Sequence, residues 1–176
     1  MTGRSVRTPA RPRSNERGAS AVEFALLVPL LVMLVFGVID FGIVLAQKQS
    51  LSSAARAGAR YGSVNLFDPD SHNCGKVIDQ TRAEAQTIAM AGTSVTVEVL
   101  RGSSLAAATR VCSTDASLTP NDSSVAPCAN ASLAAGTIEN LYVRATRRDT
   151  TIGIPATPIA ATFDLSSTGA FQCEYH

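Results

Sequence analysis

Apolar and polar positions divide the chain into a polar head, one long apolar stretch and a mixed remainder. Residues 1–18 contain five arginines and two prolines but few large apolar side chains. In the apolar stretch Phe24–Ala46 the one charged residue is Asp40, and Glu23 stands immediately before it. About 20 apolar residues are enough to cross a bilayer as a helix. The pattern therefore predicts a transmembrane segment at about residues 22–46.

The apolar stretch continues into an amphipathic segment, so the sequence predicts one long helix over residues 19–62. Small residues recur at every fourth position in Ala54, Gly58 and Gly62. Such a stripe allows close packing of another helix or of the protein's own globular part, and the sequence leaves both readings open. Pro29 lies inside the apolar part, where a proline removes a backbone hydrogen bond and favours a kink.

The remainder, residues 63–176, is expected to form a small exported domain. Apolar and small residues follow a helical period between Lys76 and Met90. Alternation at residues 95–100 and 141–146 predicts two strands, and residues 159–165 are a candidate third. The predicted fold class is α+β, with a long N-terminal transmembrane helix, one further helix and a short antiparallel sheet.

The charge distribution predicts the orientation in the membrane. The net charge is only +1, which gives no indication of nucleic-acid binding. The basic leader at residues 1–18, however, precedes the apolar stretch directly. By the positive-inside rule, the N-terminus should face the cytoplasm and the C-terminal domain the periplasm or exterior. We expect a single-pass protein of the cytoplasmic membrane in contact with lipid.

The four cysteines agree with that orientation, because all of them follow the apolar stretch. They are Cys74, Cys112, Cys128 and Cys173. An even number of cysteines in an oxidising compartment predicts two disulfides, with three possible pairings. The Ala/Ser/Thr-rich region at residues 102–136 is expected to be a long loop, and disulfides would explain how it stays ordered.

No catalytic constellation is present in the sequence. The two histidines lie outside any recognisable motif, and aromatic residues are scarce. Asp68, Asp70, His72 and Asp79 fall at calcium-loop spacing, but Asn73 stands where that loop requires glycine. We therefore expect no enzyme activity, metal, cofactor or small-molecule substrate.

A series of short motifs runs through the long helix. They are Arg17-Gly18, Val22-Glu23-Phe24-Ala25, Pro29, Phe36-Gly37, Asp40-Phe41-Gly42 and the run from Ala54 to Gly62. This region resembles the N-terminal part of TadE-like proteins, which are pilin-like minor components (pseudopilins) of the tight-adherence Tad/Flp pilus system. The likeness covers about a quarter of the chain.

The resemblance implies a maturation step and an assembly contact. A prepilin peptidase would cleave after Gly18, so that the mature chain begins at Ala19 and Glu23 becomes its fifth residue, followed by Phe24. In pilin-type assembly this glutamate neutralises the N-terminal ammonium of an adjacent subunit, which offsets the cost of burying either charge. The implied partners are other pilin-like subunits and the Tad secretion machinery, and the implied role is pilus assembly in adhesion and biofilm formation.

Two alternatives stay open. Val44-Leu45-Ala46 fits a signal-peptidase site with a mature start at Gln47, although the apolar segment exceeds the usual length and contains Asp40. The second alternative is a membrane-anchored adhesion module that uses the loop at residues 102–136. Asp40 itself is expected either to pair with a basic neighbour or to lie at the outer interface.

Overall fold

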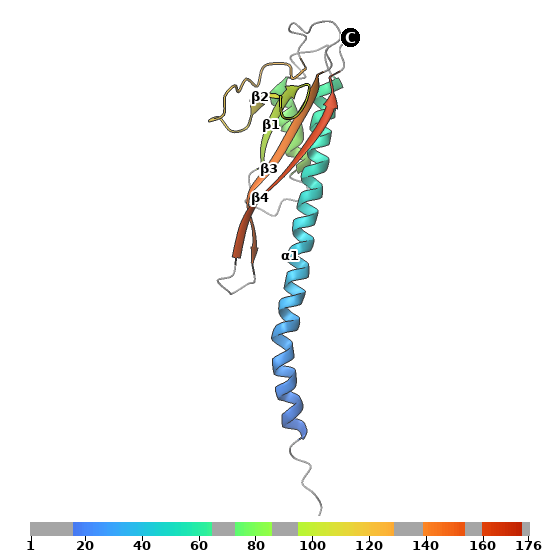
Figure 1. Ribbon diagram of the computed structural model, residues 1–176, viewed down its shortest axis with the longest axis vertical. Helices are drawn as coiled ribbons and strands as arrows, with labels where there is room; N and C mark the ends of the chain where they lie inside the picture. The colour runs from blue at the N-terminus through green and yellow to red at the C-terminus, as the bar shows by residue number, and fades with distance from the viewer. Residues whose placement is uncertain (1–15, 65–72, 86–94, 129–138, 154–159, 174–176) are drawn as a thin grey trace, which may run out of the picture. The chain divides into compact units, whose positions relative to one another are not determined.

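The structure is a computed structural model that describes residues 16–64, 73–85, 95–128, 139–153 and 160–173. The chain forms two compact units, Met1–Ile39 and Asp40–His176. Two helices and four strands are described (Figure 1): α1 Glu16–Val64, α2 Cys74–Ala85, β1 Val95–Gly102, β2 Thr109–Ser113, β3 Asn140–Gly153 and β4 Ala160–Gln172.

In the first unit, the described chain is the beginning of α1. The helix continues through Pro29 without interruption. Its large apolar side chains are exposed, with Phe24 at 69% and Leu26 at 74% of their full area. The segment Gly18–Ser63 is the one described helix that is long and apolar enough to cross a membrane, a test that a signal sequence also passes. The predicted long apolar helix is confirmed.

The second unit contains a four-stranded antiparallel sheet in the order β2-β1-β3-β4 (Figure 1). Side chains alternate between its faces. On β3, Leu141, Val143 and Ala145 are buried, whereas the residues between them are partly exposed. Val97 on β1 lies opposite Ala145 and is also buried. One face of the sheet therefore forms the core, and the α+β fold class is confirmed.

The C-terminal part of α1 and the whole of α2 pack on this inner face. A Cβ added at Gly58 would lie 2.0 Å from the Thr81 hydroxyl oxygen of α2, and one at Gly62 would lie 2.5 Å from a methyl group of Leu141 on β3. Ala54 is fully buried in the same core. The small-residue stripe therefore packs on the protein's own domain, and this face of α1 is already occupied.

Helix and sheet also approach each other closely at Gly169 on β4. A Cβ at this position would lie 2.3 Å from the backbone oxygen of Ala55 and 2.6 Å from the backbone nitrogen of Arg56. Only a residue without a side chain fits such a distance, because backbone atoms cannot rotate away as a side chain can. Gly169 therefore sets the spacing between α1 and the sheet.

The structure differs from the sequence-based expectation in the strands. The loop expected at residues 102–136 contains β2, Thr109–Ser113, which pairs with β1 and forms one edge of the sheet. β2 has only five residues, and its two apolar residues, Val111 and Cys112, are adjacent, so it shows no alternating pattern. β4 continues to Gln172, beyond the expected end at residue 165, because its Ser/Thr/Gly part is held by pairing with β3 rather than by apolar side chains.

The helices also extend beyond their expected limits. α1 ends at Val64 and α2 begins at Cys74, two residues earlier than the periodicity indicated; the expected end of that helix lies outside the described residues. The compact second unit begins at Asp40. The second half of α1 is thus part of the globular core.

A glycine substitution tests the helix–sheet spacing. Gly169→Ala should lower the free energy of unfolding by about 1–3 kcal/mol, because the added methyl group overpacks a backbone contact. Gly42→Ala is the control: nothing lies within 4 Å of a Cβ there, and alanine favours a helix. Chemical unfolding in detergent measures both. Equal stability of the two variants would contradict the proposed close contact.

Candidate functional site

The candidate processing site lies in the first turn of α1. The helix begins at Glu16, so Gly18 and Ala19 are its third and fourth residues. Both are exposed, and nothing surrounds Gly18 within 4 Å of an added Cβ. The first N–H groups of a helix have no intrahelical acceptor, so this turn is the easiest to unwind. The Gly18–Ala19 bond is therefore accessible, and presenting it in an extended form requires opening only one turn.

Glu23 and Phe24 follow one turn further along the helix. Glu23 is four residues after Ala19 and so lies on the same helical face, about 6 Å further along the axis. Both Glu23 and Phe24 are exposed. The segment thus presents an acid beside the position where cleavage would create an ammonium group.

From Ala25 to Leu45, apart from Asp40, the helix is apolar on every side. Its exposed large side chains include Leu26, Leu27, Leu30, Leu31, Met33, Leu34, Val38, Ile39 and Phe41. A helix that is apolar all round is stable only inside a protein or a membrane. An exposed apolar surface of this extent is incompatible with a free existence in water. This segment therefore requires lipid, or other helices, around it.

Asp40 stands at the beginning of the second unit and is half-buried. None of the ion pairs among the described residues includes it. Seven residues later, on the same face of the helix, Gln47 is buried against the domain. Pro29, also expected as a packing residue, is exposed in the first unit.

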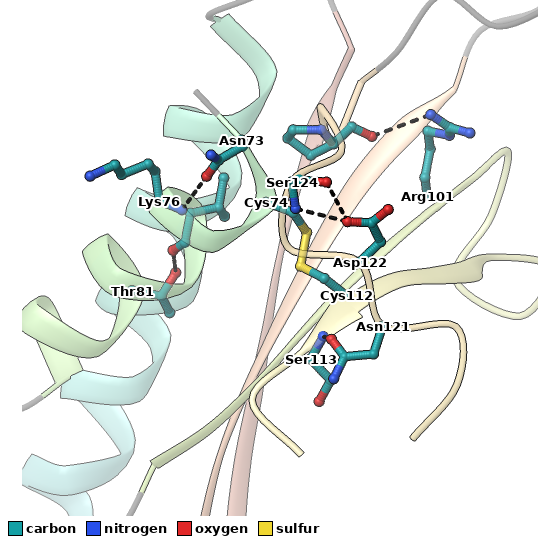
Figure 2. Close-up of a disulfide and its surroundings, with 12 residues drawn as sticks. Asn73, Cys74, Lys76, Thr81, Arg101, Cys112, Ser113, Asn121, Asp122 and Ser124 are labelled. Atoms are coloured by element: carbon teal, nitrogen blue, oxygen red, sulfur yellow. Dashed lines mark hydrogen bonds between the residues drawn. A yellow bond between two sulfur atoms is a disulfide. The ribbon is translucent and has the colours of Figure 1, made fainter. Parts of the chain in front are cut away.

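The loop at residues 114–128 is the second candidate site, and disulfides bound it on both sides. Cys74 at the start of α2 is bonded to Cys112 on β2, as Figure 2 shows, and Cys128 is bonded to Cys173 after β4. All four cysteines are buried. Of the three pairings that the sequence left open, the structure has this one.

The loop also caps the N-terminus of α2. The backbone N–H groups of Cys74 and Gly75 donate to the carbonyls of Val125 and Ser123, each at 2.9 Å. The side chain of Asn73 accepts from the N–H of Lys76 at 3.0 Å (Figure 2). These bonds satisfy donors that a helix start leaves unpaired. The loop is therefore an integral part of the domain, which the sequence did not reveal.

Two short turns fix the conformation inside the loop. Asp115 accepts hydrogen bonds from the hydroxyl and the N–H of Ser117, and Asp122 accepts the same pair from Ser124 (Figure 2). The serine hydroxyl is the main cause that lowers the pKa of each aspartate below its ordinary value, and the backbone N–H adds to it. Asp115 also forms an ion pair with Arg148 of β3, so both aspartates are engaged by the protein's own groups.

Within the described ranges, no group of three metal-ligating side chains occurs. Three members of the calcium-like spacing, Asp68, Asp70 and His72, lie outside the described residues, and Asp79 is exposed on α2. The described loop residues at 114–128 include no aromatic side chain that would stack on a sugar or base. The N-terminal helix segment is therefore the stronger candidate.

The comparison with protein families supports the importance of this segment. Residues 18–60 match the family model described as TadE-like protein. The match begins at Gly18 and ends within the part of α1 that packs on the sheet. No curated protein and no solved structure is significantly similar to the chain.

The loop turns make a pH-dependent prediction. Because folding lowers the pKa of Asp115 and Asp122, their contribution to loop order is present above the ordinary pKa of 3.8 and is lost as the pH falls through the lower folded values. The amides of Ser117 and Ser124 should then lose hydrogen-exchange protection in acid, while core amides of β3 keep theirs. An Asp115→Asn, Asp122→Asn double variant should show weak protection without this pH dependence. Protection that is unchanged down to pH 2 would refute the role of these turns.

Proposed function

We propose, from the match of residues 18–60 to the TadE-like family model, that this chain is a non-enzymatic, pilin-like minor subunit. It supports assembly of a Tad/Flp (type IVb-like) pilus that serves adhesion and biofilm formation. The observation that carries the proposal is the exposed apolar helix segment that begins with Gly18, Ala19 and Glu23. The helix anchors the protein in the cytoplasmic membrane, with its N-terminus in the cytoplasm and its disulfide-bonded domain outside.

In the proposed maturation, a prepilin peptidase cleaves after Gly18. Removal of the basic leader takes away the arginines that hold the N-terminus on the cytoplasmic side. The cut leaves an ammonium group on Ala19 at the head of an apolar helix. In low dielectric this charge requires a partner, and the carboxylate of Glu23 on an adjacent subunit supplies one.

In the helix, an intrachain pair competes with the proposed intersubunit pair for the ammonium of Ala19. Glu23 lies one turn from Ala19 of its own chain, so the new ammonium also has an intrachain partner. An exposed pair at this spacing contributes only about 0.2–0.5 kcal/mol. The exchange to an intersubunit pair is therefore favourable when the two helices pack side by side and exclude water from the pair.

Two features of the second unit weigh against the alternatives. A signal-peptidase cut after Ala46 would remove residues 40–46, which belong to the compact second unit, and would expose the end of a buried turn at Gln47. An adhesion module would use the loop at 102–136 for binding. In the part of it at 114–128, backbone carbonyls already cap α2, and the carboxylates of Asp115 and Asp122 already accept hydrogen bonds from Ser117 and Ser124.

N-terminal sequencing of the protein from its native host tests the maturation step. We expect a start at Ala19, and we expect Gly18→Leu to leave the leader attached, because a branched side chain replaces the small residue at the cut. A start at Gln47 would instead establish secretion by a signal peptide. An intact leader in the unaltered protein would support the anchored adhesion module.

Removal of the Glu23 charge tests the assembly contact. Glu23→Gln should lower the yield of surface pili at least tenfold, because a buried ammonium without its partner costs several kcal/mol. Asp79→Asn removes an exposed acid on α2 and is the matched control, expected to leave pilus yield unchanged. Piliation is counted by electron microscopy, with membrane levels of each variant measured by immunoblot. Normal piliation in Glu23→Gln would exclude the intersubunit pairing.

A further inference from the structure

Four described side chains of the second unit have buried polar atoms without a hydrogen-bond partner; one of them, Arg110, still forms an ion pair with Glu98, and the other three residues are buried as a whole. Arg147 is 1% exposed, and its Nε and Nη1 groups are both unpartnered. Thr150 is 5% exposed with an unpartnered hydroxyl, and Gln47 is 8% exposed with an unpartnered amide oxygen. We call these three residues the Arg147 cluster. Buried polar groups are normally satisfied, so each exception needs an explanation.

A β-bulge turns two of these side chains to the same face. Arg147 pairs with Leu165 and Thr150 with Phe163, so β3 has one more residue than β4 between these pairs. In a regular strand, positions 147 and 150, which are three residues apart, would face opposite sides of the sheet. With the bulge, both are buried on the inner face. Bulges that re-aim a side chain are common beside functional sites.

Contacts of α1 bring Gln47 to the same level of the sheet. Lys48 follows Gln47 on α1, and its Nζ donates a hydrogen bond to the backbone oxygen of Ser166 on β4. Ser166 adjoins Leu165, the cross-strand neighbour of Arg147. The Arg147 cluster therefore lies between α1 and the β3–β4 pair.

The energetics single out Arg147 among the arginines of the sheet. Arg101, Arg110, Arg144 and Arg148 each form an ion pair with a carboxylate, and all four are more exposed. Arg147 forms none of the ion pairs among the described residues. A buried charge without a partner is strongly unfavourable, and an apolar residue of similar size is often more stable. Such a group indicates a role that stability alone does not provide.

We propose that Arg147, Thr150 and Gln47 form a binding site for a phosphate group. A guanidinium is well suited to phosphate oxygens, because its N–H donors are fixed in a plane and always charged. The Thr150 hydroxyl supplies a further donor. If the side-chain amide of Gln47 rotates by half a turn, its NH2 group takes the place of the unpartnered oxygen and can donate to the same ligand.

The position of the cluster favours a phospholipid as the source of this phosphate, an inference that rests on the proposed membrane anchoring. The apolar stretch ends at Ala46, and Gln47 and Lys48 follow at once. At 1.5 Å per residue, they lie within about 3 Å of its end, inside the head-group layer of a bilayer. Entry to Arg147 requires β4 to separate from α1 at the Lys48–Ser166 bond, which is exposed to solvent.

Thermal unfolding of the full chain tests the site with two phosphate sources. One set of samples is in a sugar-based detergent, with sodium phosphate compared against sodium chloride at equal ionic strength. The other is in nanodiscs of phosphatidylglycerol or of a phosphate-free galactolipid. The variants are Arg147→Met, Arg147→Lys and the neighbouring exposed Arg148→Met as the matched control.

Phosphate at a hundredfold excess over its Kd should raise the unfolding temperature of the unaltered chain and of Arg148→Met by about 5–10 °C. Arg147→Lys should show a smaller rise and Arg147→Met none, while Arg147→Met without phosphate should be at least as stable as the unaltered chain. A matching rise in phosphatidylglycerol over galactolipid identifies lipid as the source. A rise with free phosphate alone supports the site and overturns the lipid source, independently of the anchoring proposal. No phosphate-dependent rise, or an equal rise in Arg147→Met, overturns the site.

Discussion

The close approach of α1 to the sheet is the constraint on which the second unit depends. At Gly169 the strand lies against the helix backbone at Ala55, and at Gly58 and Gly62 the helix in turn leaves room for α2 and β3. The core built on this contact consists mainly of valine and alanine, which provide little apolar area per residue. Short distances between backbones replace large side chains, so the fit is sensitive to single methyl groups.

The disulfides compensate for this modest core. They join residues 38 and 45 positions apart, and closing loops of that length stabilises a fold by about 4 kcal/mol each in the chain-entropy model. Cys74–Cys112 attaches α2 to the edge of the sheet, and Cys128–Cys173 attaches the capping loop to the end of β4. Disulfides form and persist in oxidising compartments. The domain therefore reaches its full stability only there.

The sequence predicted those elements whose side-chain pattern matches their environment. The apolar run and small-residue stripe identify α1, and the alternating valines identify β1. β2 and the end of β4 were missed because they are held by backbone pairing, which leaves no pattern in Ser, Thr and Gly. The cysteine pairing depends on how the loop folds back onto α2, and four cysteines alone leave three choices open. The inward position of Thr150 follows from a bulge, which shifts the alternation within a strand that otherwise reads as regular.

The contact between Lys48 and Ser166 has a consequence for self-association. β4 is an edge strand of 13 residues, and no described strand pairs with its outer side. Long edge strands readily recruit strands from other molecules, and a lysine placed at the edge is a common obstacle to this. Here α1 supplies the lysine and takes up a carbonyl group that an incoming strand would use. In the proposed membrane assembly, this positive charge would direct contacts between copies towards the helices and away from uncontrolled growth of the sheet.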